Sequence, residues 1–364
     1  MEQKNGQPAT SNQQPATSNQ NLTDKLIDSI LGTENLNDSD RTLILKNAQR
    51  LRDTKVNILI TGATGCGKSS TINALFDSEK ARVGQGANPE TMHIARYDLE
   101  NIVFFDSPGL GDGKEADRRH AKGITDKLQE TDSAGNLLID LVLVILDGGS
   151  RDLGTSYELI EKVIIPNLGE NTDRLLIAIN QADMAMKGRH WNHEKNQPEP
   201  PLIQFLDEKV ASTQRRIREA TGVDVDVIYY AAGYKDGDSQ QYPWNLSKLL
   251  AYILQHTKEE KRAVIVRDVN RNEEVWEDDD GLLNYISKVK DLVEESMLGT
   301  VLKGVASAAN FLINGISSMA SGIGSFASKA ASTVASWFGF WFGINHAIPQ
   351  KLPFRRFAPE NTRR

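Results

Sequence analysis

The sequence predicts an α/β fold, namely a doubly wound, mostly parallel sheet with helical extensions at both ends. Three observations support this fold class. Short apolar runs of strand length alternate with helical patterns between residues 56 and 256, as in sheets that carry helices on both faces. Two of the runs, 138–146 and 174–179, are almost continuously apolar, as expected for strands that are covered on both faces. The first run ends in a glycine-rich turn that opens a helical pattern.

Composition narrows the class of protein. The chain has 364 residues, of which 39% are hydrophobic and 25% charged, which suits one α/β domain with extensions. The net charge of −7 gives no sign of the basic face that nucleic-acid binding requires. The single cysteine, Cys66, excludes an intramolecular disulfide, and the N-terminus lacks the apolar run of a signal peptide. We therefore expect a cytoplasmic protein.

The N-terminal part is expected to contain a disordered polar tail, residues 1–21, and a helical extension, residues 22–54. The heptapeptide QPATSNQ at 7–13 recurs at 14–20 and has little apolar surface to bury. The repeat is either a partner-binding motif or a duplication that a terminus tolerates. In the extension, apolar spacing predicts helices at 22–31 and 40–53, which should pack on the main domain.

Residues 55–257 are expected to form the main domain. Its strands are predicted at 56–60, 92–99, 101–105, 138–146, 174–179 and 225–230. Its helices are predicted between them, at 68–76, 115–130, 155–168, 202–220 and 245–256. Sheets of this kind bind their ligands at the carboxyl ends of the strands.

The turn after the first strand has the pattern GxxxxGKS of a phosphate-binding P-loop. Glycines let the backbone curl so that its N–H groups point at phosphate oxygens, and the helix that follows adds its positive end. Lys68 should reach the β- and γ-phosphates, and Ser69 should hold Mg²⁺. Cys66 is either a redox-sensitive thiol or simply a small residue at a permissive position. The nucleotide contacts expected here are Gly62, Ala63, Thr64, Gly65, Cys66, Gly67, Lys68, Ser69 and Ser70.

Two further segments could complete the phosphate site. Asp106 begins the sequence DSPG at the end of a predicted strand, where its carboxylate could hold Mg²⁺ through water, and Gly109 could donate its N–H to the γ-phosphate. Residues 83–91 have the length and glycine content of a switch loop, and Thr91 could ligate Mg²⁺ or merely begin a strand. The candidate catalytic residues are Lys68, Thr91 and Gly109, and the candidate metal ligands are Ser69, Thr91 and Asp106.

A base-binding motif follows the strand predicted at 174–179. It consists of Asn180, Gln181, Ala182 and Asp183. A carboxylate can accept hydrogen bonds from both N1–H and the N2 amine of guanine, and adenine presents no such pair of donors. The sequence therefore predicts GTP or GDP, with Mg²⁺, as the ligand.

In order, these segments read GxxxxGKS, Thr, DxxG and NxxD, the motif series of GTPases. Over residues 56–256 the sequence resembles the Era/TrmE/septin class of Ras-like GTPases, and most of all the small Era-like GTPases of bacterial prophages and other mobile elements. The continuation SSTIN after Lys68 is also similar to chloroplast import receptors and immune-associated GTPases. The resemblance implies a Ras-like G domain, GTP hydrolysis, and a fifth motif in which Ala231 and Ala232 contact the nucleotide.

Three positions depart from that family pattern. Gln181 stands where the base motif usually has lysine, and Ala231, where serine is usual, leaves only backbone contacts. Leu110 stands where Ras-type enzymes place a water-orienting glutamine. Intrinsic hydrolysis should therefore be slow, with acceleration supplied by dimerisation across the nucleotide face or by a partner protein.

Residues 258–296 are expected to be a charged linker with a helix at 282–298, and residues 297–364 a Gly/Ala/Ser-rich amphipathic helical tail. Apolar residues recur in steps of four and three from Leu298 to Phe326, without the charges of a water-exposed coiled coil. The tail could pack through small residues in a hairpin or homodimer. It could also lie on the inner face of a membrane, helped by its aromatic and basic residues, or span the bilayer.

Three functions remain open at this point. The chain could be a switch GTPase with slow turnover, or a P-loop ATPase in which the NxxD sequence is accidental. It could also be a nucleotide-gated structural or membrane-surface protein in which hydrolysis is incidental. Competition between nucleotides separates the first two, and vesicle flotation tests the third.

Overall fold

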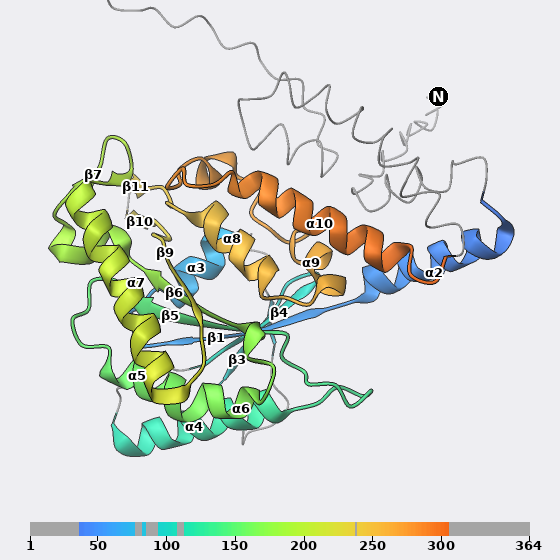
Figure 1. Ribbon diagram of the computed structural model, residues 1–364, viewed down its shortest axis with the longest axis horizontal. Coiled ribbons are helices and arrows are strands. Elements are labelled where there is room, and N and C mark those ends of the chain that lie inside the picture. Colours follow the sequence, from blue (N-terminus) through green and yellow to red (C-terminus); the bar gives the residue numbers. More distant parts are fainter. Residues whose placement is uncertain (1–35, 77–81, 85–93, 108–112, 237–238, 306–364) are drawn as a thin grey trace, which may run out of the picture.

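A seven-stranded sheet crosses the molecule in the computed structural model, which describes residues 36–76, 82–84, 94–107, 113–236 and 239–305 (Figure 1). The sheet order is β2-β3-β4-β1-β5-β6-β9. The bounds are β1 (Val56–Gly62), β2 (Arg82–Gly84), β3 (Ala95–Asp98), β4 (Ile102–Asp106), β5 (Leu141–Asp147), β6 (Leu175–Asn180) and β9 (Asp226–Tyr229). The pairs from β4 to β9 are parallel, and β2 and β3 join antiparallel at one edge. The predicted doubly wound, mostly parallel α/β fold is confirmed.

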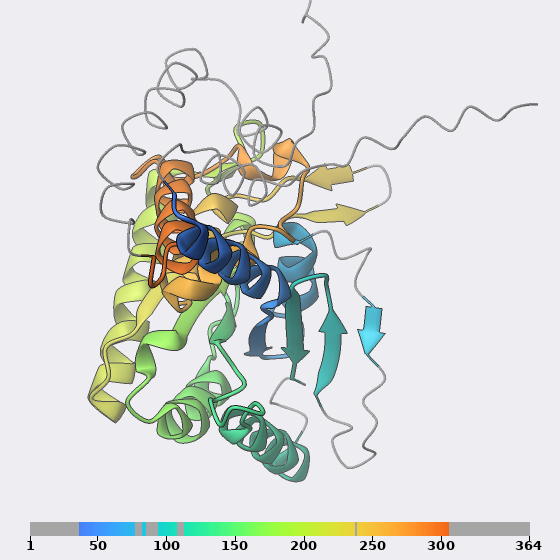
Figure 2. The same ribbon diagram turned by 90° about the vertical axis from the view of Figure 1, so that its right-hand side faces the viewer.

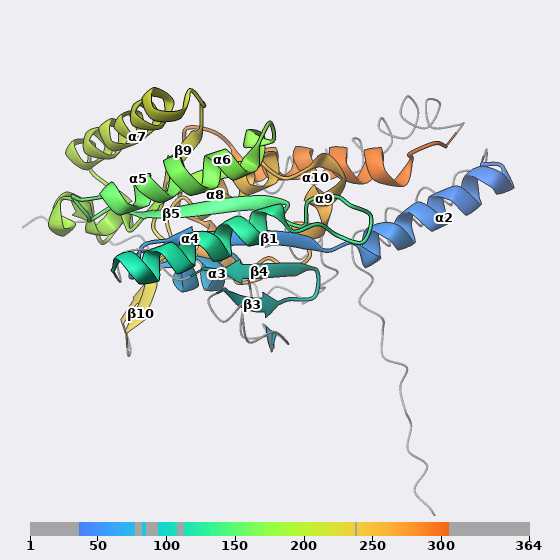
Figure 3. The same cartoon turned by 90° about the horizontal axis from the view of Figure 1, so that it is seen from below.

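Helices cover both faces of the sheet (Figure 3). One face carries α3 (Lys68–Leu75), α8 (Leu246–Gln255), α9 (Glu259–Ile265) and α10 (Tyr285–Val301), with α2 (Asp38–Asp53) beside α10. The other face carries α4 (Lys114–Gln129), α5 (Gly154–Leu159), α6 (Ile165–Leu168) and α7 (Pro200–Thr221), and a π-helical turn, Ile160–Ile164, joins α5 to α6. Two small hairpins, β7 (Trp191–Asn192) with β8 (Gln197–Pro198) and β10 (Tyr234–Asp236) with β11 (Ser239–Gln241), lie outside the main sheet.

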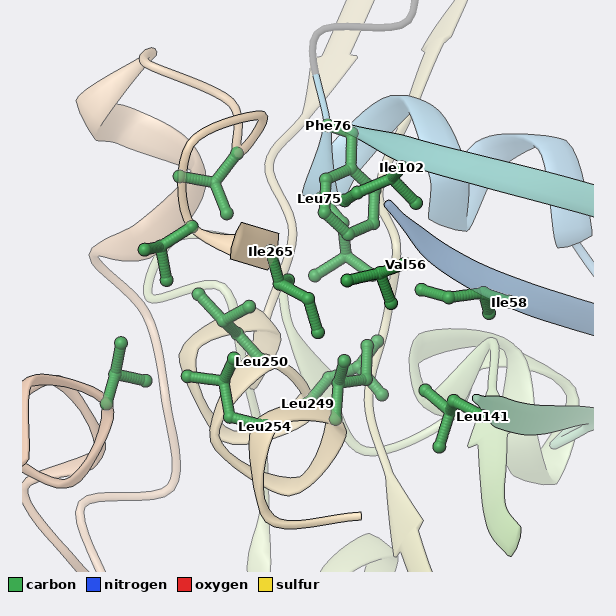
Figure 4. Packing of buried hydrophobic residues seen from close by; sticks show 14 of the residues in the cluster. Val56, Ile58, Leu75, Phe76, Ile102, Leu141, Leu249, Leu250, Leu254 and Ile265 are labelled. Atoms are coloured by element: carbon green, nitrogen blue, oxygen red, sulfur yellow. The ribbon is translucent and has the colours of Figure 1, made fainter. Parts of the chain in front are cut away.

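The strands divide their side chains between two cores, one on each face. In β1, Ile58 and Ile60 belong to one buried cluster, and Leu59, between them, belongs to the other. This alternation follows from the two-residue period of a strand, and it explains why both faces of β1 and β5 are apolar. On the first face, Leu249 and Leu250 of α8 belong to the same buried cluster as Val56 and Ile58 (Figure 4).

The two helical extensions form part of the first core. Val289 and Met297 of α10 are buried in the same cluster as Ile44 and Leu51 of α2. Asn47 of α2 donates from Nδ2 to the carbonyl oxygens of Val301 and Lys303, at 3.1 and 3.0 Å. These carbonyls lie at the carboxyl end of α10, where helical hydrogen bonding leaves acceptors unused. Figure 2 shows the two helices side by side.

The structure differs from the sequence expectations in three segments. Residues 83 and 84, expected to begin the switch loop, belong to the short edge strand β2, which pairs with β3. Residues 259–265, placed in a charged linker, form α9, because Ala263, Val264 and Ile265 are apolar and buried against the sheet. The apolar stripe expected to run as a helix from Leu298 is broken at 302–304. Gly304 has a φ of +77°, and Leu302 packs into the core instead.

Other expectations were confirmed or lie outside the described residues. The helices expected at 40–53 and 282–298 are observed as Asp38–Asp53 and Tyr285–Val301. The disordered tail, the helix expected at 22–31, and the tail from residue 306 onward all lie outside the described residues. In the part of the chain that is described, no helix is both long and apolar enough to cross a membrane.

Asn245 fastens the C-terminal extension to the sheet. It is fully buried with a left-handed φ of 59°, and its Nδ2 donates to the carbonyl of Tyr229 at the end of β9, at 3.1 Å. Its Oδ1 accepts from the N–H of Asp280 at 2.8 Å, and its own N–H donates to the carbonyl of Asp278 at 2.8 Å. Lys248 pairs with Asp280 at 2.6 Å. One buried amide therefore joins β9, the edge strand of the sheet, to the segment that leads into α10.

Replacing Asn245 should destabilise the fold. Asn245→Ala loses the side-chain hydrogen bonds to Tyr229 and Asp280 and forces alanine into the left-handed region, so we expect the free energy of unfolding to fall by about 2–4 kcal/mol. For Asn245→Gly the free energy of unfolding should fall by about 1 kcal/mol less than for Asn245→Ala, since glycine adopts this φ freely. Urea unfolding measures both. The exposed Asn171→Ala is the matched control and should change stability by less than about 0.5 kcal/mol. Equal stability of Asn245→Ala and the natural chain would contradict the role assigned to Asn245.

Candidate functional site

At two positions, the loop between β1 and α3 has a backbone conformation that only glycine can adopt. Gly62 and Gly67 have φ values of +149° and +90°. A Cβ atom at Gly62 would lie 2.2 Å from the carbonyl oxygen of Ile145 on β5, and one at Gly67 would lie 2.2 Å from Nδ2 of Asn180. The loop therefore passes directly against β5 and the end of β6, and it turns into the start of α3.

Lys68 bonds within this loop, and Thr71 connects the loop to the rest of the site. The ammonium Nζ of Lys68 donates to the carbonyl of Gly62 at 3.1 Å, so it lies within the turn of the loop. Thr71 donates from its hydroxyl to the carbonyl of Gly67 at 2.8 Å, and its Oγ1 lies 2.5 Å from the hydroxyl of the buried Tyr230. The first turn of α3 is thus held to the residue that follows β9.

Asn180 joins three segments that are far apart in sequence. Its side chain is 2% exposed; Nδ2 donates to the carbonyl of Cys66 at 3.0 Å, and Oδ1 accepts from the N–H of Ala232 at 3.0 Å. Its own carbonyl accepts from the N–H of Gly148, after β5, at 2.7 Å. Gln181, with a φ of 59°, donates from Nε2 to the carbonyl of Gly65 at 2.9 Å. The P-loop, the end of β6 and the loop after β9 are therefore held together.

A cavity of about 590 Å³ opens where these segments meet. Asp183 lies at this cavity and is largely buried, and burial raises the pKa of its carboxyl group. The cavity takes its lining from the P-loop, the ends of β5 and β6, and the loop after β9. The lining residues are Gly67, Ser70, Asp147, Gly149, Asn180, Gln181, Asp183, Met184, Ala232, Gly233 and Tyr234.

Asp106 lies at the carboxyl end of β4, in register with Ile60 of β1. Its Oδ1 is buried and has no hydrogen-bond partner among the described residues. Burial raises the pKa of this carboxyl group, and the charge of Lys68 opposes that shift. A buried carboxylate oxygen without a donor is costly unless another positive group approaches it. The site therefore fits a divalent cation such as Mg²⁺, which prefers carboxylate oxygens as ligands.

The other predicted residues are only partly described. Ala63, Thr64, Ser69 and Ser70 lie in the loop and the first turn of α3, with Ser69 and Ser70 exposed. Ala231 is buried, and both its N–H and its C=O pair with Trp244, whereas Ala232 lines the cavity. Thr91, Gly109 and Leu110, and all of the expected switch loop beyond Gly84, lie outside the described residues.

Asp147 and Lys209 are among the side chains near the cavity that sequence reasoning missed. Asp147 ends β5, and its Oδ1 accepts from the N–H groups of Gly149 and Ser150 at 2.7 and 3.2 Å. Lys209 of α7 donates from Nζ to the carbonyls of Asp147, Gly148 and Ser150 at 2.8–3.2 Å, and burial lowers the pKa of its ammonium group. Asp147 could have been found in the same way as Asp106, because it also stands at the carboxyl end of a predicted strand. Lys209 has no local signal.

Comparison with known proteins gives a consistent result. Residues 57–181 match the family model described as 50S ribosome-binding GTPase. A segment of 114 residues is 32% identical to translocase of chloroplast 126 from Physcomitrium patens, covering 30% of this chain and 10% of that protein. A segment of 147 residues is 30% identical to the uncharacterized protein YfjP of Escherichia coli K12, covering 39% of this chain and 47% of YfjP. The chain thus spans less than half the length of either relative.

Among solved structures, Toc33 from Arabidopsis thaliana is 16% identical, covers 60% of this chain and 92% of its own, and has a TM-score of 0.39. At that TM-score the likeness supports no conclusion about function. The matched family segment begins in β1 and ends at Gln181, so it contains the P-loop, Asp106 and the first part of the base motif. From its first strand to that motif, the chain is similar to a P-loop GTPase domain of the Ras-like kind.

The thiol of Cys66 should react slowly in the folded protein. Burial raises its pKa to about 11, against the opposing charge of Lys68, so only about one thiol in a thousand is ionised at pH 8. We expect iodoacetamide to alkylate Cys66 at least ~100-fold faster in urea than in buffer, with the native rate rising as the pH approaches 11. Ser70→Cys, exposed in the same segment, is the positive control, and mass spectrometry measures both. Rapid native alkylation at pH 8 would favour the redox-sensitive interpretation of this thiol.

Proposed function

We propose that the chain is a GTP-binding switch protein that binds GTP with Mg²⁺ and hydrolyses it slowly to GDP and phosphate. The observation that carries this proposal is the buried side chain of Asn180, which bonds the P-loop at Cys66 and the loop after β9 at Ala232. Through these two contacts, the P-loop and the carboxylate of Asp183 lie at the same cavity. The family match over residues 57–181 supports the same assignment.

The P-loop residues would hold the phosphates. Glycine at positions 62 and 67 lets the backbone curl, and backbone N–H groups then point at phosphate oxygens. Lys68, whose ammonium group now bonds the carbonyl of Gly62, would move to the β- and γ-phosphates. Ser69, Asp106 and Thr91 would hold Mg²⁺, and the bound ion would supply the charge that offsets the phosphate oxygens. Gly109 would contact the γ-phosphate.

The base would lie in the cavity against Asp183. Its carboxylate would accept from N1–H and the N2 amine of guanine, and adenine would leave the buried oxygens unpaired. Asn180 would position this segment rather than read the base, since its amide nitrogen and oxygen already have partners in the protein. Gln181 would lie across the P-loop, where its Nε2 bonds Gly65.

Hydrolysis would be slow without a second molecule, because Leu110 cannot orient water. We propose that a homodimer across the nucleotide face, or another protein, supplies the missing group.

We also propose that the protein acts in the cytoplasm. The segment from residue 306 onward would pack against another helix, form a homodimer contact, or bind the inner face of a membrane. These roles follow from the sequence of that segment, which lies outside the described residues.

Base preference tests the assignment of Asp183. Asp183→Asn should weaken GDP binding by about 2–4 kcal/mol, because an amide cannot accept from both guanine donors, and should favour xanthine nucleotides, whose added carbonyl can accept from the amide. Calorimetric titration with GDP, GTP, XDP and ATP, with and without Mg²⁺, measures this. If the natural chain binds ATP as tightly as GTP, the guanine assignment fails and the ATPase alternative gains.

Turnover tests the assignment of the phosphate site. Lys68→Ala should abolish productive nucleotide binding, and Ser69→Ala should remove the dependence of binding on Mg²⁺. The natural chain alone should hydrolyse GTP at roughly 10⁻⁴–10⁻³ s⁻¹, the range of an unstimulated GTPase switch. Phosphate release at several protein concentrations measures the rate. A value of about 1 s⁻¹ that does not depend on concentration would refute the slow switch, since it approaches the roughly 5–20 s⁻¹ of a switch stimulated by a partner protein.

A further inference from the structure

The two sides of the cavity proposed to bind the base offer different amounts of apolar surface. On the base-motif side, Gln181 has only two methylene groups, and its amide nitrogen is already bonded to the carbonyl of Gly65 at 2.9 Å. It therefore offers little surface to the face of a purine ring. On the other side, the loop after β9 places Tyr234 at the cavity, with half of that residue exposed (50%).

The backbone that carries Tyr234 is fixed on both sides. Gly233 has a φ of +70°, and a Cβ atom there would lie 2.4 Å from the carbonyl oxygen of Gln241 and 2.9 Å from the nitrogen of Pro243. Ala232 is bonded to Asn180, and Tyr234 begins the β10–β11 hairpin, in register with Gln241. The chain that leaves the hairpin therefore passes directly against Gly233, and Tyr234 is held at the edge of the cavity by backbone contacts on either side.

We propose that the ring of Tyr234 stacks on the face of the bound purine and supplies the apolar contact that Gln181 is too short to supply. This inference rests on the proposed function, because it concerns the same nucleotide. An aromatic ring contacts the flat face of a base and does not distinguish its edges, so stacking raises affinity for any purine equally. Tyr234 would then add to the affinity without selecting the base, and Asp183 would select it.

The test compares two nucleotides that differ only at one edge of the base. GDP carries the N2 amine, and inosine diphosphate lacks it. We measure dissociation constants for both with the natural chain, Tyr234→Ala and Tyr234→Phe. Base–aromatic stacking predicts that Tyr234→Ala weakens both nucleotides by the same factor, between about 5- and 150-fold. Tyr234→Phe keeps the ring and should stay within about twofold of the natural chain.

Tyr242 provides a matched control. It follows the same hairpin, is also exposed (36%), and is not among the residues that line the cavity, so Tyr242→Ala should leave both dissociation constants unchanged. Asp183→Asn serves as the opposite control, because it should change the ratio of the GDP and inosine diphosphate affinities. Thermal unfolding of each variant shows whether the hairpin and the core remain folded.

The outcomes separate the two levels of the argument. If the natural chain binds neither nucleotide, the proposed function fails. If the natural chain binds GDP and Tyr234→Ala binds it equally well, the function stands and the stacking role is wrong. If Tyr234→Ala changes the ratio of the two affinities as Asp183→Asn does, the substitution acts on the edge contacts and the stacking role is again wrong. Equal weakening of both, with rescue by phenylalanine, supports it.

Discussion

Everything at the carboxyl edge of the sheet depends on one buried amide. Asn180 is the last residue of β6, and its side chain bonds the P-loop on one side and the loop after β9 on the other. A buried amide that lost either partner would leave an unpaired polar group in a dry environment, which costs about 1–3 kcal/mol. Both loops are therefore held against the end of β6, on either side of the cavity.

The parallel sheet makes this arrangement available. Because β1, β4, β5 and β6 run in one direction, Gly62, Asp106, Asp147 and Asn180 all come to the same edge. Strand direction thus brings together a glycine turn, two carboxylates and an amide that are far apart in the sequence. At the opposite edge of the same strands, residues such as Asp268 and Asp140 bond backbone N–H groups and a lysine, so their charges serve the fold.

Most of the fold and part of the candidate site could be predicted from the sequence, for identifiable physical reasons. Buried parallel strands are continuous apolar runs, and a P-loop is a local pattern, so β5, β6 and Lys68 follow from neighbouring letters. Edge strand β2 is only three residues long and carries no periodicity. The helix α9 begins with Glu259 and Glu260, which are typical of a linker. Lys209 bonds backbone carbonyls that are distant in sequence, and Tyr234 comes to the cavity only through the fold of the chain after β9, so no nearby residues signal either.

The contact between Asn47 and the end of α10 has a consequence for how this chain can be divided. Met297, Val301 and Leu302 are buried in the core that also contains Ile44, and Gly299 approaches Glu259 so closely that a Cβ atom would lie 2.6 Å from its carboxylate. The two helical extensions and this face of the sheet therefore share one buried core. A shortened version made for crystallisation or for separate study of the tail must keep the chain from α2 through residue 305. A cut inside α10 would unfold the part that it was meant to isolate.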